Sequence, residues 1–203
     1  HFLKAVDLDS TYVNSLSGLA LVYIRWQKYD QALRYALKNL ALDPASHNAY
    51  VTLGISYGGN GDLLRAEQAF KQAVSIYPES KEGWTNLGVI YSQQQIWDKA
   101  AEAYSKAVAA DPGEPSHYND LAVVLTRKGD VSRAVELWKK ALSLDPGQLE
   151  SRMNLAQALE NSEPAGAAAQ WQIFLQTAQK LGQPVNRDFI DRRIEALKNN
   201  EKN

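Results

Sequence analysis

Residues 81–114 decide the fold, and they read KEGWTNLGVIYSQQQIWDKAAEAYSKAVAADPGE. Apolar residues recur at helical spacing in two runs, one containing Leu87 and Tyr91 and the other containing Ala100 and Tyr104. The Asp-Pro pair near the end of the stretch stops the second run, because the residue before a proline disfavours the helical conformation. The stretch therefore predicts two helices joined by a short turn.

The same pattern recurs with a period of 34 residues along the chain. The prolines that close successive units are Pro44, Pro78, Pro112 and Pro146. Counting that proline as position 32, the residue at position 7 is Leu19, Leu53, Leu87 and Leu121. Position 20 is Ala32, Ala66, Ala100 and Ala134. A period of this length, with two helices in each unit, predicts a linear stack of helix pairs.

Small and large residues alternate between the two helices of a pair. Position 8 is small in every unit: Ala20, Gly54, Gly88 and Ala122. Position 24 is aromatic at Phe70, Tyr104 and Trp138, with Ala36 as the exception. Position 27 is Ala73, Ala107 and Ala141, with Asn39 as the exception. Small residues at positions 8 and 20 allow the paired helices to approach closely, and large residues fill the space beside them.

Residues 50–78 resemble the tetratricopeptide repeat family, whose motif places Trp or Tyr, Leu, Gly, Tyr, Ala, an aromatic residue, Ala and Pro at eight fixed positions. The matching residues are Tyr50, Leu53, Gly54, Tyr57, Ala66, Phe70, Ala73 and Pro78. Residues 84–112 match the motif equally well, and the resemblance extends over residues 1 to about 175. It implies an all-α fold: a right-handed superhelical solenoid of antiparallel helix pairs, with about five repeats and a C-terminal capping helix.

The resemblance also implies the division of the chain. The predicted repeats are residues 13–46, 47–80, 81–114 and 115–148, followed by a divergent fifth repeat over 149–180. In that repeat Ser162 is a plausible N-cap, and Pro164 suits the first turn of the second helix. Residues 181–203 form the predicted capping helix and tail, with Ile190, Ile194 and Leu197 on one stripe.

Residues 1–12 are expected to be the end of a truncated preceding repeat. Phe2 and Ala5 fall on positions 24 and 27 of a unit whose first helix is absent. The chain is therefore expected to be a fragment or processed product of a longer array, with an uncapped apolar face near residues 1–12. Such a face would allow self-association.

The resemblance implies that the first helices of the pairs line a concave groove that binds a protein or peptide partner. The expected groove residues are Asn14, Ser17, Leu21, Asn48, Val51, Thr52, Ile55, Glu82, Thr85, Asn86, Val89, Asn119, Asp120, Val123, Arg127, Met153, Asn154 and Gln157.

Position 6 of the repeats reads Gly18, Thr52, Asn86, Asp120 and Asn154, so the two asparagines form a partial row of amides. An asparagine amide both donates and accepts, so a row of them can pair with the backbone of an extended peptide. The row resembles the asparagine ladder in the repeat arm of O-linked N-acetylglucosamine transferases, although three members interrupt it. Solvated amides on an exposed helix face are the alternative.

Two apolar features have alternative interpretations. Position 9 carries Leu21, Ile55, Val89 and Val123, which predicts either an apolar stripe for a ligand or partial burial between neighbouring helices. Trp26 is either an exposed anchor for a partner or a ring packed against Tyr29.

The charge pattern argues against the carboxylate clamp known in this family, which needs lysine and arginine at positions 2, 5 and 6. Position 2 reads Asn14, Asn48, Glu82, Ser116 and Glu150. Together with Glu160, these acids predict a groove that is weakly acidic toward its C-terminal half. A neutral or basic segment fits such a groove better.

No catalytic or metal site is expected. His1, His47 and His117 do not converge, Asp120 stands alone in the groove, and the chain contains no cysteine. The Gly-Gly-Asn-Gly run at 58–61 lacks the strand and the lysine of a phosphate loop, so it is interpreted as a turn between helices.

These observations predict a non-catalytic scaffold without a cofactor. A formal charge of −1 disfavours nucleic acid as a partner, and no apolar run is long enough for membrane insertion. Two alternatives remain open: the substrate-recruiting arm of a larger enzyme such as a glycosyltransferase, and a self-assembling structural module. The composition is compatible with the cytoplasm and, after removal of a signal peptide, with the periplasm.

Overall fold

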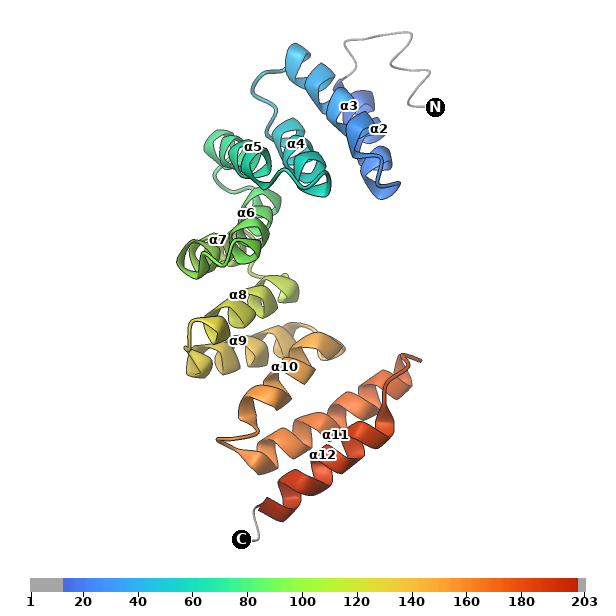
Figure 1. Ribbon diagram of the computed structural model, residues 1–203, viewed down its shortest axis with the longest axis vertical. Helices are drawn as coiled ribbons and strands as arrows, with labels where there is room; N and C mark the ends of the chain where they lie inside the picture. Colours follow the sequence, from blue (N-terminus) through green and yellow to red (C-terminus); the bar gives the residue numbers. More distant parts are fainter. Residues whose placement is uncertain (1–12, 201–203) are drawn as a thin grey trace. The chain divides into compact units, whose positions relative to one another are not determined.

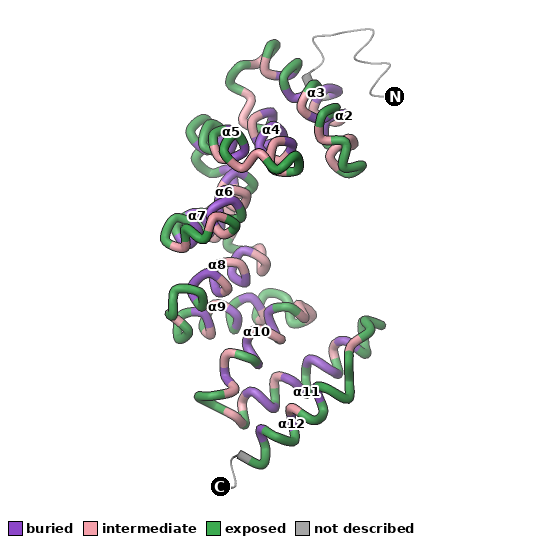
Figure 2. The backbone as a smooth tube through the Cα atoms, in the orientation of Figure 1, coloured by how far each residue is buried: buried purple, intermediate pink, exposed green. Residues whose placement is uncertain are grey.

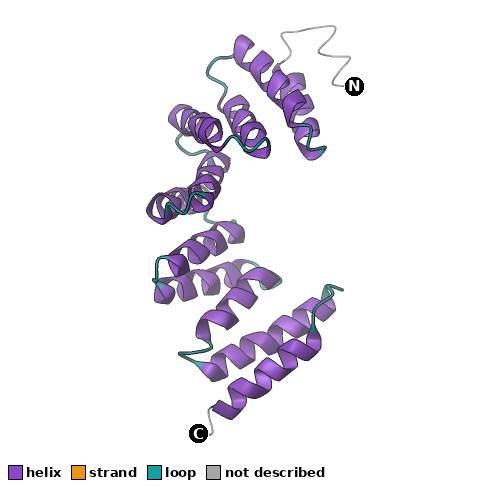
Figure 3. Ribbon diagram, in the orientation of Figure 1, coloured by secondary structure: helices purple, strands orange, loops and turns teal. Residues whose placement is uncertain are grey.

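The structure is a computed structural model that describes residues 13–200, with the side chains of residues 15–199. These residues form eleven α-helices and no strand, which confirms the all-α prediction (Figure 3). The predicted apolar face at Phe2 and Ala5, and the predicted truncated repeat over 1–12, lie outside the described residues. The helices fall into two compact units that divide between Asp111 and Pro112.

The first unit contains six described helices: α2 (Val13–Arg25), α3 (Tyr29–Leu42), α4 (His47–Gly59), α5 (Leu63–Ile76), α6 (Lys81–Gln93) and α7 (Trp97–Ala110). The pairs are α2 with α3, α4 with α5 and α6 with α7 (Figure 1). Each pair also contacts the next, through α3 and α4 and through α5 and α6. The first helices of successive pairs touch as well, α2 with α4 and α4 with α6.

The second unit contains five helices: α8 (Pro115–Arg127), α9 (Val131–Leu144), α10 (Leu149–Leu159), α11 (Pro164–Lys180) and α12 (Arg187–Asn200). Here α8 pairs with α9, α10 pairs with α11, and α12 packs on α11. The two first helices, α8 and α10, are also in contact.

The polar residues before several helices act as caps. The side chains of Ser46 and Ser80 accept hydrogen bonds from the first-turn amides of α4 and α6. Asp62 and Asp130 do the same for α5 and α9. The prediction for Ser162 was wrong, because the N-cap of α11 is Glu163, whose side chain makes no capping bond. Pro164 is the first residue of α11, where its missing N–H leaves no bond unmade.

The turns inside the first four pairs each contain a left-handed residue. Gly61 and Gly129 supply it in two pairs, with φ of 81° and 86°. Gln27 and Gln95 occupy the equivalent place in two others, with φ of 56° and 59°. Left-handed backbone is unfavourable for a residue that carries a Cβ, so these two turns are strained relative to the glycine turns.

The interfaces within the pairs follow the periodic sequence pattern. The four alanines at position 20 are fully buried: Ala32, Ala66, Ala100 and Ala134. The aromatic residues at position 24 are buried beside them, and buried residues recur along every pair (Figure 2). The exception at Asn39 is also buried, and its Nδ2 donates to Ser17 Oγ at 2.7 Å. The core therefore accepts a polar residue where a second polar residue faces it.

Position 4 of the pairs has a role that the sequence pattern did not reveal. Trp84 Nε1 donates to the carbonyl oxygen of Pro78 at 2.7 Å. Tyr118 Oη donates to Pro112 O at 3.0 Å, and Arg152 Nη2 to Pro146 O at 2.8 Å. Each bond satisfies the carbonyl of the proline that ends the preceding repeat unit. In these three pairs position 4 holds a donor on a long side chain, whereas the first pair has Leu16 there, which has no donor.

The last helix covers the end of the second unit. Ile190, Ile194 and Leu197 are buried, as the predicted stripe requires. Arg193 forms a two-pronged ion pair with Glu160, which also accepts a hydrogen bond from Trp171 Nε1 at 2.9 Å. Glu160 was expected to make the groove acidic. Its carboxylate instead joins α10 to α11 and α12.

Candidate functional site

The first helices of the first unit expose a row of apolar side chains. Leu21 on α2 is 53% exposed, Val89 on α6 is 38% exposed, and Ile55 on α4 is half-buried between them in sequence order. These three residues hold the same position in successive pairs, and their helices are in contact. We call them the apolar stripe. Leu21 is exposed over about half of its surface, whereas Val89 and Ile55 are partly buried, as the alternative of partial burial also expects.

Polar groups lie on the same helices as the apolar stripe. Asn48 and Glu82 are exposed, and Asn86 is half-buried. Asn86 Nδ2 donates to Glu82 O at 2.8 Å, which leaves the amide oxygen as an acceptor. Of the other expected groove residues, Ser17 and Thr85 are half-buried. The side chain of Asn14 lies outside the described part of the chain.

Two expected groove residues of α4 are inaccessible. Val51 is 8% exposed and Thr52 is 6% exposed. Thr52 Oγ1 donates to Asn48 O at 2.9 Å, so its hydroxyl serves its own helix. The neighbouring first helices, α2 and α6, both contact α4. The expectation that Val51 and Thr52 line a groove was therefore wrong.

Asn119 of α8 is buried and acts as a hub, because its side chain accepts hydrogen bonds from three other side chains. It is 3% exposed, and its Oδ1 accepts hydrogen bonds from Trp138 Nε1 at 3.0 Å, Asn154 Nδ2 at 3.1 Å and Ser151 Oγ at 3.3 Å. The expected groove role of Asn119 was wrong. The available signal was Trp138 at position 24, because a buried indole N–H requires an acceptor.

A depression of about 320 Å³ lies between α8 and α10. Its lining comprises Val123, Thr126, Arg127, Trp138, Asn154, Gln157 and Ala158. Four of these were expected groove residues, on two different helices: Val123, Arg127, Asn154 and Gln157. Met153 is half-buried and does not line it. The second unit thus offers a shallow site with apolar side chains and a polar rim.

Asp120 has a charged neighbour, contrary to the expectation that it stands alone. Burial, as the larger cause, and the negative charge of Glu150 together raise the pKa of Asp120 to about 6. A hydrogen bond with Asn119 opposes the shift. Within the described residues neither carboxylate forms an ion pair.

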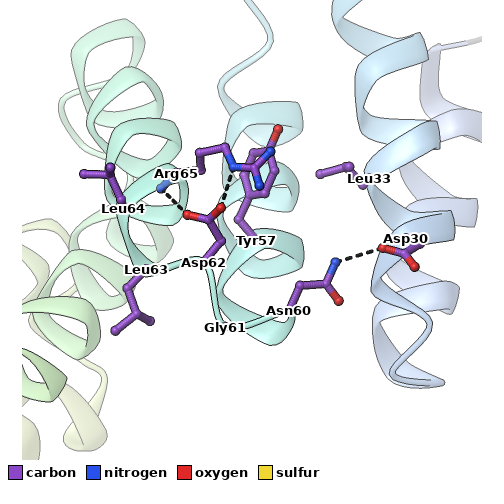
Figure 4. A pocket seen from close by; sticks show the side chains of 9 residues that line it. All are labelled: Asp30, Leu33, Tyr57, Asn60, Gly61, Asp62, Leu63, Leu64 and Arg65. Atoms are coloured by element: carbon purple, nitrogen blue, oxygen red, sulfur yellow. Dashed lines mark hydrogen bonds and ion pairs between the residues drawn. The ribbon is translucent and has the colours of Figure 1, made fainter.

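A second depression, of about 660 Å³, lies at the turn between α4 and α5 (Figure 4). Asp62 accepts from the backbone N–H of Arg65 at 3.0 Å and pairs with its guanidinium, which stacks over Tyr57 at 4.7 Å. Asn60 Nδ2 donates to Asp30 Oδ1 at 2.9 Å. The prediction that 58–61 is a turn is correct only for Asn60 and Gly61, because Gly58 and Gly59 are the last two residues of α4. The carboxylates of Asp30 and Asp62 would repel a phosphate.

Trp26 is exposed, as expected for an anchor. Its side chain is 62% exposed. The ring packs edge-to-face against Tyr23, with centroids 5.9 Å apart, and Lys28 Nζ lies 5.5 Å from the indole centroid. The aromatic contact is therefore with Tyr23 of the same helix pair, in place of the contact with Tyr29 considered from the sequence.

Residues 13–200 hold no cluster of three histidine, aspartate or glutamate side chains positioned to bind a metal ion. His47 packs against Tyr77, with ring centroids 4.9 Å apart, and His117 is buried. Among the described helices, none has the length and apolar character needed to span a bilayer.

Comparisons with known proteins agree with this architecture. A sequence model of the tetratricopeptide repeat matches residues 51–115 and 119–173, more than half of the chain. No curated protein sequence matches the chain. PilF of Pseudomonas aeruginosa is structurally similar, with a TM-score of 0.77, 19% identity and coverage of 94% of this chain and 92% of that one.

Two other solved structures are similar. MamA has a TM-score of 0.72 and 22% identity, over 83% of this chain and 92% of that one. YrrB, described as a TPR protein with an unusual peptide-binding site, has a TM-score of 0.69 and 19% identity, over 87% of this chain and 92% of its own. At these identities the likeness establishes the fold.

Proposed function

Because the chain belongs to the tetratricopeptide repeat family, we propose that it is a non-catalytic interaction module. It binds a segment of a partner protein against the first helices of its pairs. The observation that carries this proposal is the apolar stripe of the first unit, in which Leu21 and Val89 are exposed at the same position of two pairs.

Single exposed apolar residues are common on protein surfaces and need no explanation. Leu21, Ile55 and Val89 differ because they form a row at one repeat position, on three helices that contact in sequence order. Burying apolar surface contributes about 25 cal/mol for each Å² removed from water. A partner segment that crosses the three helices would cover all three side chains, so the stripe favours an elongated ligand.

The polar groups beside the stripe suit the backbone of such a ligand. Asn48 is exposed, and Asn86 retains an amide oxygen that can accept a backbone N–H. Each such bond contributes only about 0.5–1.5 kcal/mol net, so the amides add to apolar contact and do not replace it. The amide row that suggested a glycosyltransferase arm is interrupted by Gly18, buried Thr52 and Asp120, so the general peptide-binding role is the better supported of the two.

A capture experiment tests the proposal. The double variant Leu21→Asp, Val89→Asp places charges on the stripe, at exposed positions where folding should be preserved. The matched control is Leu64→Asp on α5, which changes a side chain that is 67% exposed and lies outside the stripe. We expect a partner protein, identified by mass spectrometry, to be retained by the wild type and the control and lost by the double variant. Equal capture by all three proteins would refute the proposal.

A further inference from the structure

The face formed by α8 and α10 carries three chemical layers. Asp120 and Glu150 form the first layer, Val123 and Asn154 the second, and Arg127 and Gln157 the third; each step is three or four residues along its helix. One helical turn advances by about 5.4 Å, so the acidic and cationic layers are about 10 Å apart. We call this surface the α8–α10 face.

The charges at the two ends of the face are not neutralised within the described part of the second unit. Asp120, Glu150 and Arg127 make no ion pair there. Glu150 lies in the first turn of α10 and Arg127 in the last turn of α8, where the helix dipole favours their charges. The dipole does not explain Asp120, which lies in the middle of α8, half-buried and close to a second carboxylate. A cation from outside would relieve this repulsion.

The middle layer contains the depression between the helices. Val123, Trp138 and Ala158 contribute apolar surface to it, and its volume of about 320 Å³ gives room for one large apolar side chain. Asn154 is held in place by its bond to the Asn119 hub. The depression thus lies between an acidic end and a cationic end on a face whose position is fixed by buried hydrogen bonds.

We propose that the α8–α10 face binds an amphipathic helix of a partner protein that carries an acidic residue at position i, an apolar residue at i+3 or i+4 and a basic residue at i+7. The acidic side chain pairs with Arg127, the apolar one enters the depression, and the basic one meets Asp120 and Glu150. The inference rests on the proposed function and adds the chemistry of the partner.

The layer spacing selects a helix as the occupant. A partner helix has the same rise as α8, so its residues i, i+4 and i+7 lie on one face and meet the three layers in turn. An extended segment places alternate side chains on one side at steps of about 6.8 Å, which exceeds the layer steps of about 5 Å, so three such side chains would not meet the three layers. The order of charges also sets the direction: the partner helix runs antiparallel to α8, with its acid near its own N-terminus and its base toward its C-terminus, as its dipole favours.

Two synthetic peptides of about 18 residues test the proposal, each stapled on the opposite face because short isolated helices are marginal. The ordered peptide carries Glu, Leu and Lys at i, i+4 and i+7 of an alanine-based helix. The exchanged peptide has the same composition with Glu and Lys interchanged. The full chain should bind the ordered peptide about tenfold more tightly, measured by fluorescence anisotropy, which corresponds to about 1.4 kcal/mol.

Charge reversal supplies the decisive variant. Arg127→Glu should abolish the preference for the ordered peptide. A third peptide, with Lys in place of Glu at i, should bind this variant more tightly than it binds the wild type. Lys140→Glu, at an exposed position on α9, is the control with the same change of charge and should behave as the wild type.

Equal affinities of the wild type for the ordered and exchanged peptides, or no binding of either, would overturn the inference. Neither result affects the capture experiment on Leu21 and Val89, which depends on the first unit. Conversely, retention of the ordered peptide by the Leu21→Asp, Val89→Asp variant would support the placement of this site in the second unit.

Discussion

A Cβ atom on Gly54 would lie 2.4 Å from Cε1 of Phe70. The ring of Phe70, on the second helix of the pair, occupies the space that a side chain on the first helix would need. At the equivalent place in the next pair, a Cβ on Gly88 would lie 2.7 Å from the ring of Tyr104. Where position 24 is the small Ala36, position 8 is Ala20 and not glycine, whereas the fourth pair combines Ala122 with Trp138.

Gly54→Ala should therefore destabilise the first unit by about 1–3 kcal/mol, because the added methyl group overpacks a filled interface. Gly58→Ala is the control on the same helix: its Cβ would lie 3.8 Å from the Cβ of Ala66, an ordinary contact. That change should stabilise the helix by about 0.5–1 kcal/mol. Urea unfolding of both variants measures the difference, and a Gly54→Ala variant as stable as the wild type would contradict this account.

Gln95→Gly should stabilise the protein by about 0.5–1 kcal/mol. Gln95 has a φ of 59°, which glycine adopts without the clash of a Cβ, and this gain exceeds the added entropy of the unfolded chain. The adjacent change Gln94→Gly is the control. Gln94 has a φ of −80°, so glycine there should destabilise by a similar amount. Opposite signs for the two neighbours in thermal unfolding are the expected result; equal signs would show that φ does not determine the effect.

Asn119→Ala should destabilise the second unit by about 2–4 kcal/mol. The change leaves the buried Trp138 Nε1 without its acceptor, which costs about 1–3 kcal/mol, and it also removes the packing of the buried Asn119 side chain. Ser151 Oγ keeps Gln148 Oε1 as a hydrogen-bond partner. Asn154→Ala removes one donor to the same oxygen and should cost about 1 kcal/mol or less. Chemical unfolding monitored by Trp fluorescence compares the two variants. An equal loss of stability in both would argue against Asn119 as the hub.

The helix pairs were predictable because the residues that pack them recur with the repeat period. Leu87, Ala100 and Tyr104 are all buried, and each has counterparts at the same position of the other units. The repeat period and the sizes of the residues together predict which side chains face each other within a pair. A single sequence therefore contains several independent copies of the same packing information.

The exposed surface of the first helices was less predictable, because the burial of each side chain on it depends on the side chains of the neighbouring pair. Asn119 and Asn86 occur on equivalent first helices, at adjacent repeat positions, yet only Asn119 meets a buried tryptophan. Thr52 is buried on α4, which contacts the first helices of the pairs on both sides. The residues next to Thr52 in the sequence do not indicate this burial. The depression between α8 and α10 similarly depends on side chains from two pairs, with the small Ala158 of α10 and Val123 of α8 both in its lining.

Asp120→Asn should stabilise the protein at neutral pH and have little effect in acid. The pKa of Asp120 is raised from 3.8 to about 6 by burial and by Glu150, so the folded state binds a proton more tightly than the unfolded state. Ionisation of Asp120 therefore lowers the free energy of unfolding. This loss is absent below about pH 4, grows as the pH rises between 3.8 and about 6, and is complete above that range.

Asparagine keeps the shape and an acceptor oxygen but carries no charge, so the variant should gain about 1–2 kcal/mol at pH 7.5, after allowance for screening by solvent. At pH 4 the gain should nearly vanish, because Asp120 is then protonated in the folded protein. Glu150→Gln should lower the pKa of Asp120 but leave it above 3.8, because burial is the larger cause of the shift. Urea unfolding at the two pH values gives the stabilities, and an NMR titration of the Asp120 carboxyl carbon gives the pKa. A gain in the free energy of unfolding from Asp120→Asn that is the same at both pH values would show that the Asp120 carboxylate is not destabilised by its surroundings.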